Sequence, residues 1–125
     1  MANSEKYEAG MKVRREVLGE EHVNASMASA TGIQAWMQEL TTEMAWGTIW
    51  TRPGLPRKTR SLLVIGMLTA LGKTPELKLH LRGALRNGCT EEEIGEALLQ
   101  AAVYAGIPAG IEAFRAAREV FAERA

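Results

Sequence analysis

The stretch SLLVIGMLTAL, Ser61–Leu71, decides the fold class of this 125-residue chain. It is long enough for about three helical turns and carries apolar side chains on nearly every side. Pro56 suits the first position of this helix, and Gly72 is a natural stop. A helix without a polar face is buried on all sides of its own chain or buried in a subunit interface. We therefore expect an all-α fold built around this helix.

Helices continue on the C-terminal side of this stretch. Thr74-Pro75 begins a helix that ends at Asn87-Gly88. The pattern Thr90-Glu-Glu-Glu93 is a capping box that opens the next helix, which ends at Gly106. Pro108 begins a last helix that continues to the C-terminus. No segment alternates with period two, so we expect no sheet.

The N-terminal side predicts two further helices. Ser4 can cap one that runs to Leu18 before Gly19, and residues 20–30 are small and polar, which indicates a loop with possible helical turns. A second helix follows and ends at Gly47. Its apolar stripe consists of Ile33, Trp36, Met37, Leu40 and Met44, and we interpret Met11, Met37, Met44 and Met67 as core residues. The prediction is one domain, residues 1–125, forming a bundle of about six helices.

Composition excludes several classes of function. Fifteen basic and fifteen acidic residues give a net charge of zero, so there is no broad attraction for nucleic acid or for an anionic membrane. No stretch approaches the about 18 apolar residues of a membrane span, and the N-terminus lacks the apolar run of a signal peptide. One cysteine, Cys89, provides no disulfide, redox pair or thiolate metal site. We expect a cytoplasmic protein without nucleic-acid or membrane partners.

Glu76 and His80 form the first candidate site, in the stretch TPELKLHLRG. Residues four apart on a helix lie close enough to hydrogen-bond, and a carboxylate beside an imidazole raises its pKa. That arrangement suits proton transfer near neutral pH. The same spacing is common in surface ion pairs without function, so both interpretations stay open.

The second candidate site lies between Trp46 and Arg60. It contains two tryptophans and four cations: Trp46, Trp50, Arg52, Arg57, Lys58 and Arg60. Arginine binds carboxylates through two hydrogen bonds, and tryptophan can wall off a flat ligand. The alternative is a solvated loop that its tryptophans anchor to the core. Tyr104 can supply a hydroxyl to a site or pack against the core.

Several longer motifs carry a family resemblance. They are KYEAGMKVRREVLGEEHV, TEMAWGTIWTRPGLPRKTRSL, ELKLHLRGALRNGCTEEEIGEALLQAAVYAGIPA and EAFRAAREVF. Over nearly its whole length the chain resembles the carboxymuconolactone decarboxylase family, in the alkylhydroperoxidase D-like superfamily. The resemblance implies an all-α homo-oligomer, such as a trimer or hexamer, with no metal and no organic cofactor. It implies decarboxylation of 4-carboxymuconolactone, a dicarboxylate lactone, to the 3-oxoadipate enol-lactone in the β-ketoadipate pathway of protocatechuate catabolism.

The resemblance also implies roles for the candidate residues. His80 would stabilise the enolate and donate a proton, and Glu76 would orient it. Alkylhydroperoxidase D-like proteins carry C-x-x-C-x-x-x-H at this position, but here Lys73 and Glu76 replace both cysteines, which excludes thiol peroxidase chemistry. The substrate-binding candidates are Trp46 and Trp50 as an apolar wall, Arg52, Arg57 and Arg60 for the carboxylates, and Tyr104.

Three departures from the family pattern bear on the substrate. Met44 stands where a tyrosine is usual, Pro56 stands where an acidic residue is usual, and residues 24–39 differ from the usual acidic stretch. They permit a paralogue that acts as a decarboxylase or isomerase on a related lactone. A non-catalytic helical oligomerisation protein of the same fold is a further alternative.

Overall fold

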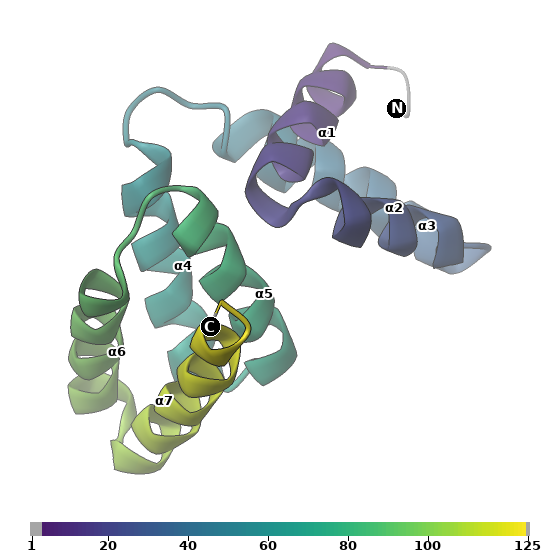
Figure 1. The fold of residues 1–125 in the computed structure, drawn as a ribbon. Coiled ribbons are helices and arrows are strands. Elements are labelled where there is room, and N and C mark those ends of the chain that lie inside the picture. The colour runs from purple at the N-terminus through teal and green to yellow at the C-terminus, as the bar shows by residue number, and fades with distance from the viewer. Residues whose placement is uncertain (1–3, 125) are drawn as a thin grey trace. The chain divides into compact units, whose positions relative to one another are not determined.

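A computed structural model of the chain describes residues 4–124, which form seven α-helices and one π-helix and contain no strand. The all-α prediction is therefore confirmed for this part of the chain. The residues divide into two compact units, one ending at Leu55 and the other beginning at Pro56 (Figure 1).

The N-terminal unit contains α1 (Glu5–Leu18), α2 (Glu20–Ser29), α3 (Ile33–Leu40) and the π-helix η1 (Thr41–Ile49). The predicted cap of α1 is confirmed, because the Ser4 hydroxyl accepts a hydrogen bond from the Tyr7 amide at 3.0 Å. The same hydroxyl donates to the Glu43 carboxylate at 3.0 Å. Ser4 therefore also ties the start of α1 to η1.

The prediction of a loop over residues 20–30 is wrong, since most of this segment is α2. Glu20 and Glu21 lie in its first turn, where carboxylates interact favourably with the helix dipole. Val23 is fully buried, so α2 gains a packing contact that its small, polar sequence did not indicate. This additional helix is one reason why the predicted number of about six was too low.

The expected helix end at Gly47 is also wrong, because Gly47 lies inside η1, which continues to Ile49. A Cβ atom on Gly47 would collide with the Lys6 carbonyl oxygen of α1. Glycine is therefore required at this position for close approach of two backbones rather than for helix termination.

The C-terminal unit contains four helices: α4 (Arg57–Leu71), α5 (Thr74–Arg86), α6 (Glu91–Ala105) and α7 (Ile107–Ala122). Its predicted boundaries agree with the structure to within one residue, except that α7 ends at Ala122 and does not continue to the C-terminus. Gly72 adopts the left-handed conformation, with φ 70° and ψ 29°. The Thr90–Glu93 capping box is complete, with hydrogen bonds of 2.8 and 3.0 Å. Both α4 and α7 pack against α5 and α6, which closes the unit around one core.

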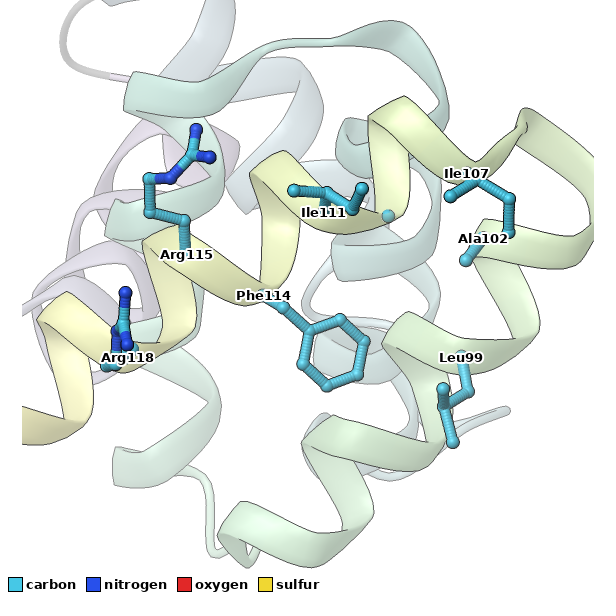
Figure 2. Close-up of a pocket in the computed structure, with 8 residues that line it drawn as sticks. Leu99, Ala102, Ile107, Ile111, Phe114, Arg115 and Arg118 are labelled. Atoms are coloured by element: carbon cyan, nitrogen blue, oxygen red, sulfur yellow. The ribbon is translucent and has the colours of Figure 1, made fainter.

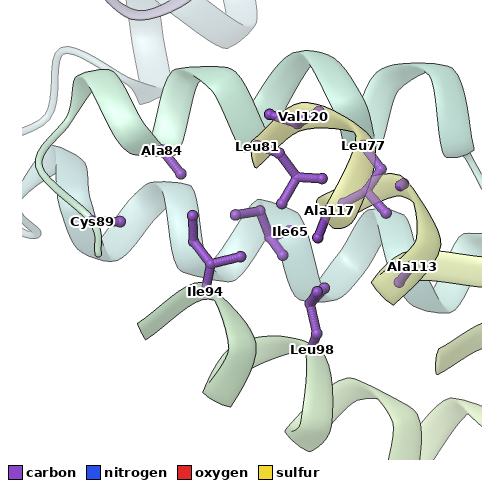
Figure 3. Close-up of a cluster of buried hydrophobic side chains, with 11 residues drawn as sticks. Ile65, Leu77, Leu81, Ala84, Cys89, Ile94, Leu98, Ala113, Ala117 and Val120 are labelled. Carbon is purple, nitrogen blue, oxygen red and sulfur yellow. The ribbon is translucent and has the colours of Figure 1, made fainter. Parts of the chain in front are cut away.

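The core of this unit draws on all four helices (Figure 3). Ile65 of α4 lies at its centre, and short alanine side chains on α7 let that helix approach closely. Most of its members are less than 2% exposed. The core residues are Ile65, Leu77, Leu81, Ala84, Cys89, Ile94, Leu98, Ala113, Ala116, Ala117 and Val120.

The apolar stretch Ser61–Leu71 is covered on one face only. Its buried residues are Ser61, Ile65 and Thr69. On the outer face, Met67 is 58% exposed and Leu71 is 67% exposed. The prediction that this helix is buried on all sides within its own chain is therefore wrong. Its burial against another subunit stays a prediction.

The apolar stripe predicted on the second helix is likewise exposed. Trp36 is 71% exposed, and α3 has no buried residue. Met37, Met44 and Met67 are exposed, so their assignment to the core is wrong, and Met11 is only half-buried. Periodicity identifies which side chains share a helix face, but it does not identify what covers that face.

Candidate active site

The rings of Trp46 and Trp50 pack against each other, tilted, at the end of η1. Their ring centroids are 4.8 Å apart, with the planes inclined by 30°. Trp46 is 4% exposed and Trp50 is 9% exposed. Such a pair adds to packing beyond its buried area, and it anchors the turn that follows at residues 51–55. This burial is compatible with a loop that its tryptophans anchor, and contact of the tryptophans with a substrate stays a prediction.

The cations of the predicted cluster are divided between the two units. Arg52 is exposed in the turn after η1, whereas Arg57 and Arg60 lie in the first turn of α4, exposed and half-buried respectively. Lys58 is engaged elsewhere, because its ammonium pairs with the Glu93 carboxylate at 2.7 Å. That hydrogen bond raises the pKa of Lys58 and lowers the pKa of Glu93. Lys58 therefore links the start of α4 to α6.

Glu76 and His80 lie one turn apart on α5, as the sequence predicts. Glu76 is exposed in the first helical turn, and His80 is half-buried. An adjacent face of α5 is packed into the core through Leu77, Leu81 and Ala84. Because that packing holds the helix, the direction of the His80 side chain is constrained. A half-buried imidazole is both partly desolvated and reachable by a ligand.

Tyr104 lies apart from this pair, on an apolar groove between α4 and α6. The groove has a volume of about 500 Å³, and its lining contains residues of α4 and α6 only. Tyr104 is 82% exposed at the C-terminal end of α6. The groove thus brings Tyr104 together with Leu63 and Met67, and not with the Glu76–His80 pair of α5.

A second groove, between α6 and α7, has a volume of about 560 Å³.

The sequence analysis did not predict this second groove. Figure 2 shows Phe114 pointing toward the α6 side, with Arg115 and Arg118 at the end away from Ile107. Its other lining residues, such as Leu99, are mainly apolar and exposed. The signal was present in the sequence, because α6 and α7 carry more apolar positions than one buried stripe requires.

Arg14 is a second feature that the sequence analysis missed. It is only 5% exposed, although it carries a charge. Gly10, Val13 and Val17 are buried on the same helix at helical spacing, and Arg14 falls within that buried stripe. A cation at a core position of an amphipathic helix was the signal that could have identified it.

Within residues 4–124 no helix is long and apolar enough to cross a membrane. The same part of the chain contains no group of three or more His, Cys, Asp or Glu side chains placed to hold a metal ion.

Comparison with known proteins identifies the family. The sequence profile of the carboxymuconolactone decarboxylase family matches residues 36–119. The chain belongs to this family. The match includes every candidate residue predicted above, from Trp46 to Tyr104.

Two relatives of this chain have names that state an activity. The chain is 46% identical to the 4-carboxymuconolactone decarboxylase of Acinetobacter baylyi over 121 residues, which cover 97% of this chain and 90% of that protein. It is 53% identical to the nitrosuccinic acid decarboxylase of Metarhizium robertsii over 107 residues, which cover 86% of this chain and 75% of that protein. Both relatives are named as decarboxylases.

Proposed function

We propose that this chain decarboxylates 4-carboxymuconolactone to the 3-oxoadipate enol-lactone, without a cofactor, in protocatechuate catabolism. The observation that carries the proposal is the similarity to the Acinetobacter baylyi enzyme along nearly the full length of both chains. Membership of the carboxymuconolactone decarboxylase family supports the same activity.

The reaction needs no external electron sink. The bond between a ring carbon and its carboxylate breaks, and CO2 leaves. The electron pair delocalises through the ring double bond onto the carbonyl oxygen of the lactone. The protein must then hold the substrate, stabilise the developing enolate and return a proton to carbon. These three tasks require only side chains.

We assign the proton transfer to His80, oriented by Glu76. The position of both residues on one side of the well-packed helix α5 supports this assignment. Positioned proton transfer contributes about 10²–10⁴-fold in rate. His80 would donate its proton to carbon after CO2 has left.

Substrate binding is assigned to the arginines and tryptophans. Arg52 is the first candidate for a carboxylate, with Arg57 and Arg60 as further candidates and Tyr104 as a source of a hydroxyl. The exposure of Arg52 and Arg57 supports this, because exposed guanidinium groups can be reached by a ligand. Trp46 and Trp50 would provide an apolar wall that disfavours the reacting carboxylate and so promotes its loss.

A direct assay tests the proposal. Purified protein is incubated with 4-carboxymuconolactone while loss of the substrate and release of CO2 are followed. Stoichiometric CO2 release by wild type, with nearly complete loss in a folded His80→Ala variant, is the expected result. Turnover of neither this lactone nor nitrosuccinic acid would instead favour a non-catalytic oligomerisation protein.

A related substrate is the second candidate. The similarity to the nitrosuccinic acid decarboxylase supports it, as do the departures from the family pattern at Met44 and Pro56. Both substrates should therefore be assayed side by side. A larger kcat/KM for nitrosuccinic acid, or for another lactone, would identify the chain as a paralogue.

We further propose that residues 1–125 act as one alkylhydroperoxidase D-like domain within a homo-oligomer, a trimer or hexamer. The family match extends across the boundary at Leu55, which supports the single functional domain. Exposed apolar side chains such as Leu63, Met67 and Trp36 support association with further copies. The free thiol of Cys89 is consistent with our assignment to the cytoplasm.

A further inference from the structure

Arg14 is a buried cation in the N-terminal unit. Its side chain lies in the buried stripe of α1, and desolvation by that burial lowers the pKa of the guanidinium. A charge removed from water is costly unless an opposite charge or several hydrogen bonds compensate it. Burial of the Arg14 charge therefore requires such a partner.

The hydrogen-bond partners of Arg14 within residues 4–124 are both uncharged. Nη1 donates to the Thr42 hydroxyl at 3.1 Å and lies 3.8 Å from the Met27 sulfur. The Nε–H group is buried and has no acceptor in this part of the chain. The guanidinium thus retains donor capacity that matches a carboxylate.

Nearby carboxylates are engaged by other residues. Arg15, the half-buried neighbour of Arg14, pairs with Glu20 at 2.7 Å. Glu43, next to Thr42 on η1, accepts a hydrogen bond from Ser4 at 3.0 Å. The half-buried Arg15 therefore has an acidic partner, whereas the buried Arg14 has only uncharged partners in this part of the chain.

Met27 is the partner that a ligand would displace. Its thioether is a weak hydrogen-bond acceptor on a flexible side chain, and the residue is only half-buried. Thr42, by contrast, is fully buried on the π-helix that also carries Trp46. π-Helical turns occur frequently at functional sites.

We propose that Arg14 and Thr42 form a carboxylate-binding subsite for the substrate. The inference rests on the proposed function, since the reaction requires a second carboxylate to be held while the first is lost. Both residues belong to the N-terminal unit. Arg14 binds the carboxylate through its free N–H groups, and Thr42 holds the guanidinium in place.

Paired variants test the subsite. Arg14→Met removes the charge but keeps a long side chain, and Arg15→Met is the matched control on the next residue. Succinate, a plain dicarboxylate, is the probe in calorimetric titrations, and KM is measured with the lactone. Arg14→Met should weaken succinate binding and raise KM about 10- to 100-fold, the loss expected for a charge-assisted hydrogen bond. Arg15→Met should leave both unchanged.

Thermal unfolding separates binding from a structural role. If Arg14 is retained for binding, Arg14→Met should unfold at the same or a higher temperature, because an uncompensated buried charge has been removed. Thr42→Val, which removes only the hydroxyl, should weaken succinate binding even if Arg14→Met does not fold. Equal succinate affinity of wild type and both variants, including no binding by any of them, overturns the subsite. Absence of turnover by wild type, with succinate binding that depends on Arg14, overturns the proposed function alone.

Discussion

Gly10 of α1 and Gly47 of η1 meet where the two helices cross. A Cβ atom on Gly10 would lie 2.6 Å from the Gly47 nitrogen and would collide with the Thr42 carbonyl oxygen. Neither backbone can move away easily, because Trp46 and Val13 are buried beside the crossing. Two glycines therefore determine how closely these helices pack in the N-terminal unit.

Gly47→Ala should destabilise the protein by about 1–3 kcal/mol, because the added methyl group overpacks the crossing. Gly95→Ala on α6 is the matched control, since nothing lies within 4 Å of its added Cβ atom. The control should be neutral or stabilising by about 0.5–1 kcal/mol. Urea unfolding of both variants measures the difference, and equal midpoints would contradict the close crossing.

His80→Ala should lower kcat by about 10²-fold or more while the helical circular dichroism stays unchanged. Glutamine at this position should rescue little, because it cannot deliver a proton. Glu76→Gln should be milder, and the double variant should be no worse than His80→Ala if the two residues act as a unit. A near-normal kcat for His80→Ala would eliminate the proposed mechanism.

Arg52→Ala should raise KM more than it lowers kcat, since its assigned role is to hold a substrate carboxylate. Steady-state kinetics with the lactone provide the measurement. Unchanged kinetics in a folded variant would move this role to Arg57 or Arg60.

Glu123→Gln should reduce stability near neutral pH but not in acid. Two hydrogen bonds from Arg82, at 2.9 and 2.8 Å, lower the pKa of Glu123 below its ordinary value of about 4.3. The stabilisation is present above the unfolded-state pKa and is lost as pH falls through the lower folded-state pKa. Melting temperatures of wild type and variant should therefore converge in acid. The exposed Glu96→Gln serves as the control, and a difference that persists in acid would argue against the ion pair.

Met67→Glu should reduce the mass of the particle in solution, because it places a charge on an exposed apolar face of α4. Light scattering at micromolar concentration compares it with wild type and with Lys12→Glu on α1. A monomeric wild type would refute the proposed oligomer, and an unchanged mass for Met67→Glu would locate the interface elsewhere.

The sequence by itself determined the helical class and the boundaries of α4 to α7. These boundaries depend on local chemistry: Gly72 can adopt positive φ, and Thr90 and Glu93 satisfy amide groups within one turn. The shared face of Glu76 and His80 was predictable for the same reason, because helical spacing alone places residues four apart together.

Only the tertiary structure decided which faces are covered. Trp36 and Met67 are exposed despite their apolar periodicity, whereas Arg14 is buried despite its charge. The need for glycine at residue 47 of η1 arises from contact with α1, which is distant in sequence. Periodicity describes one helix at a time, but burial depends on the segments that pack against it.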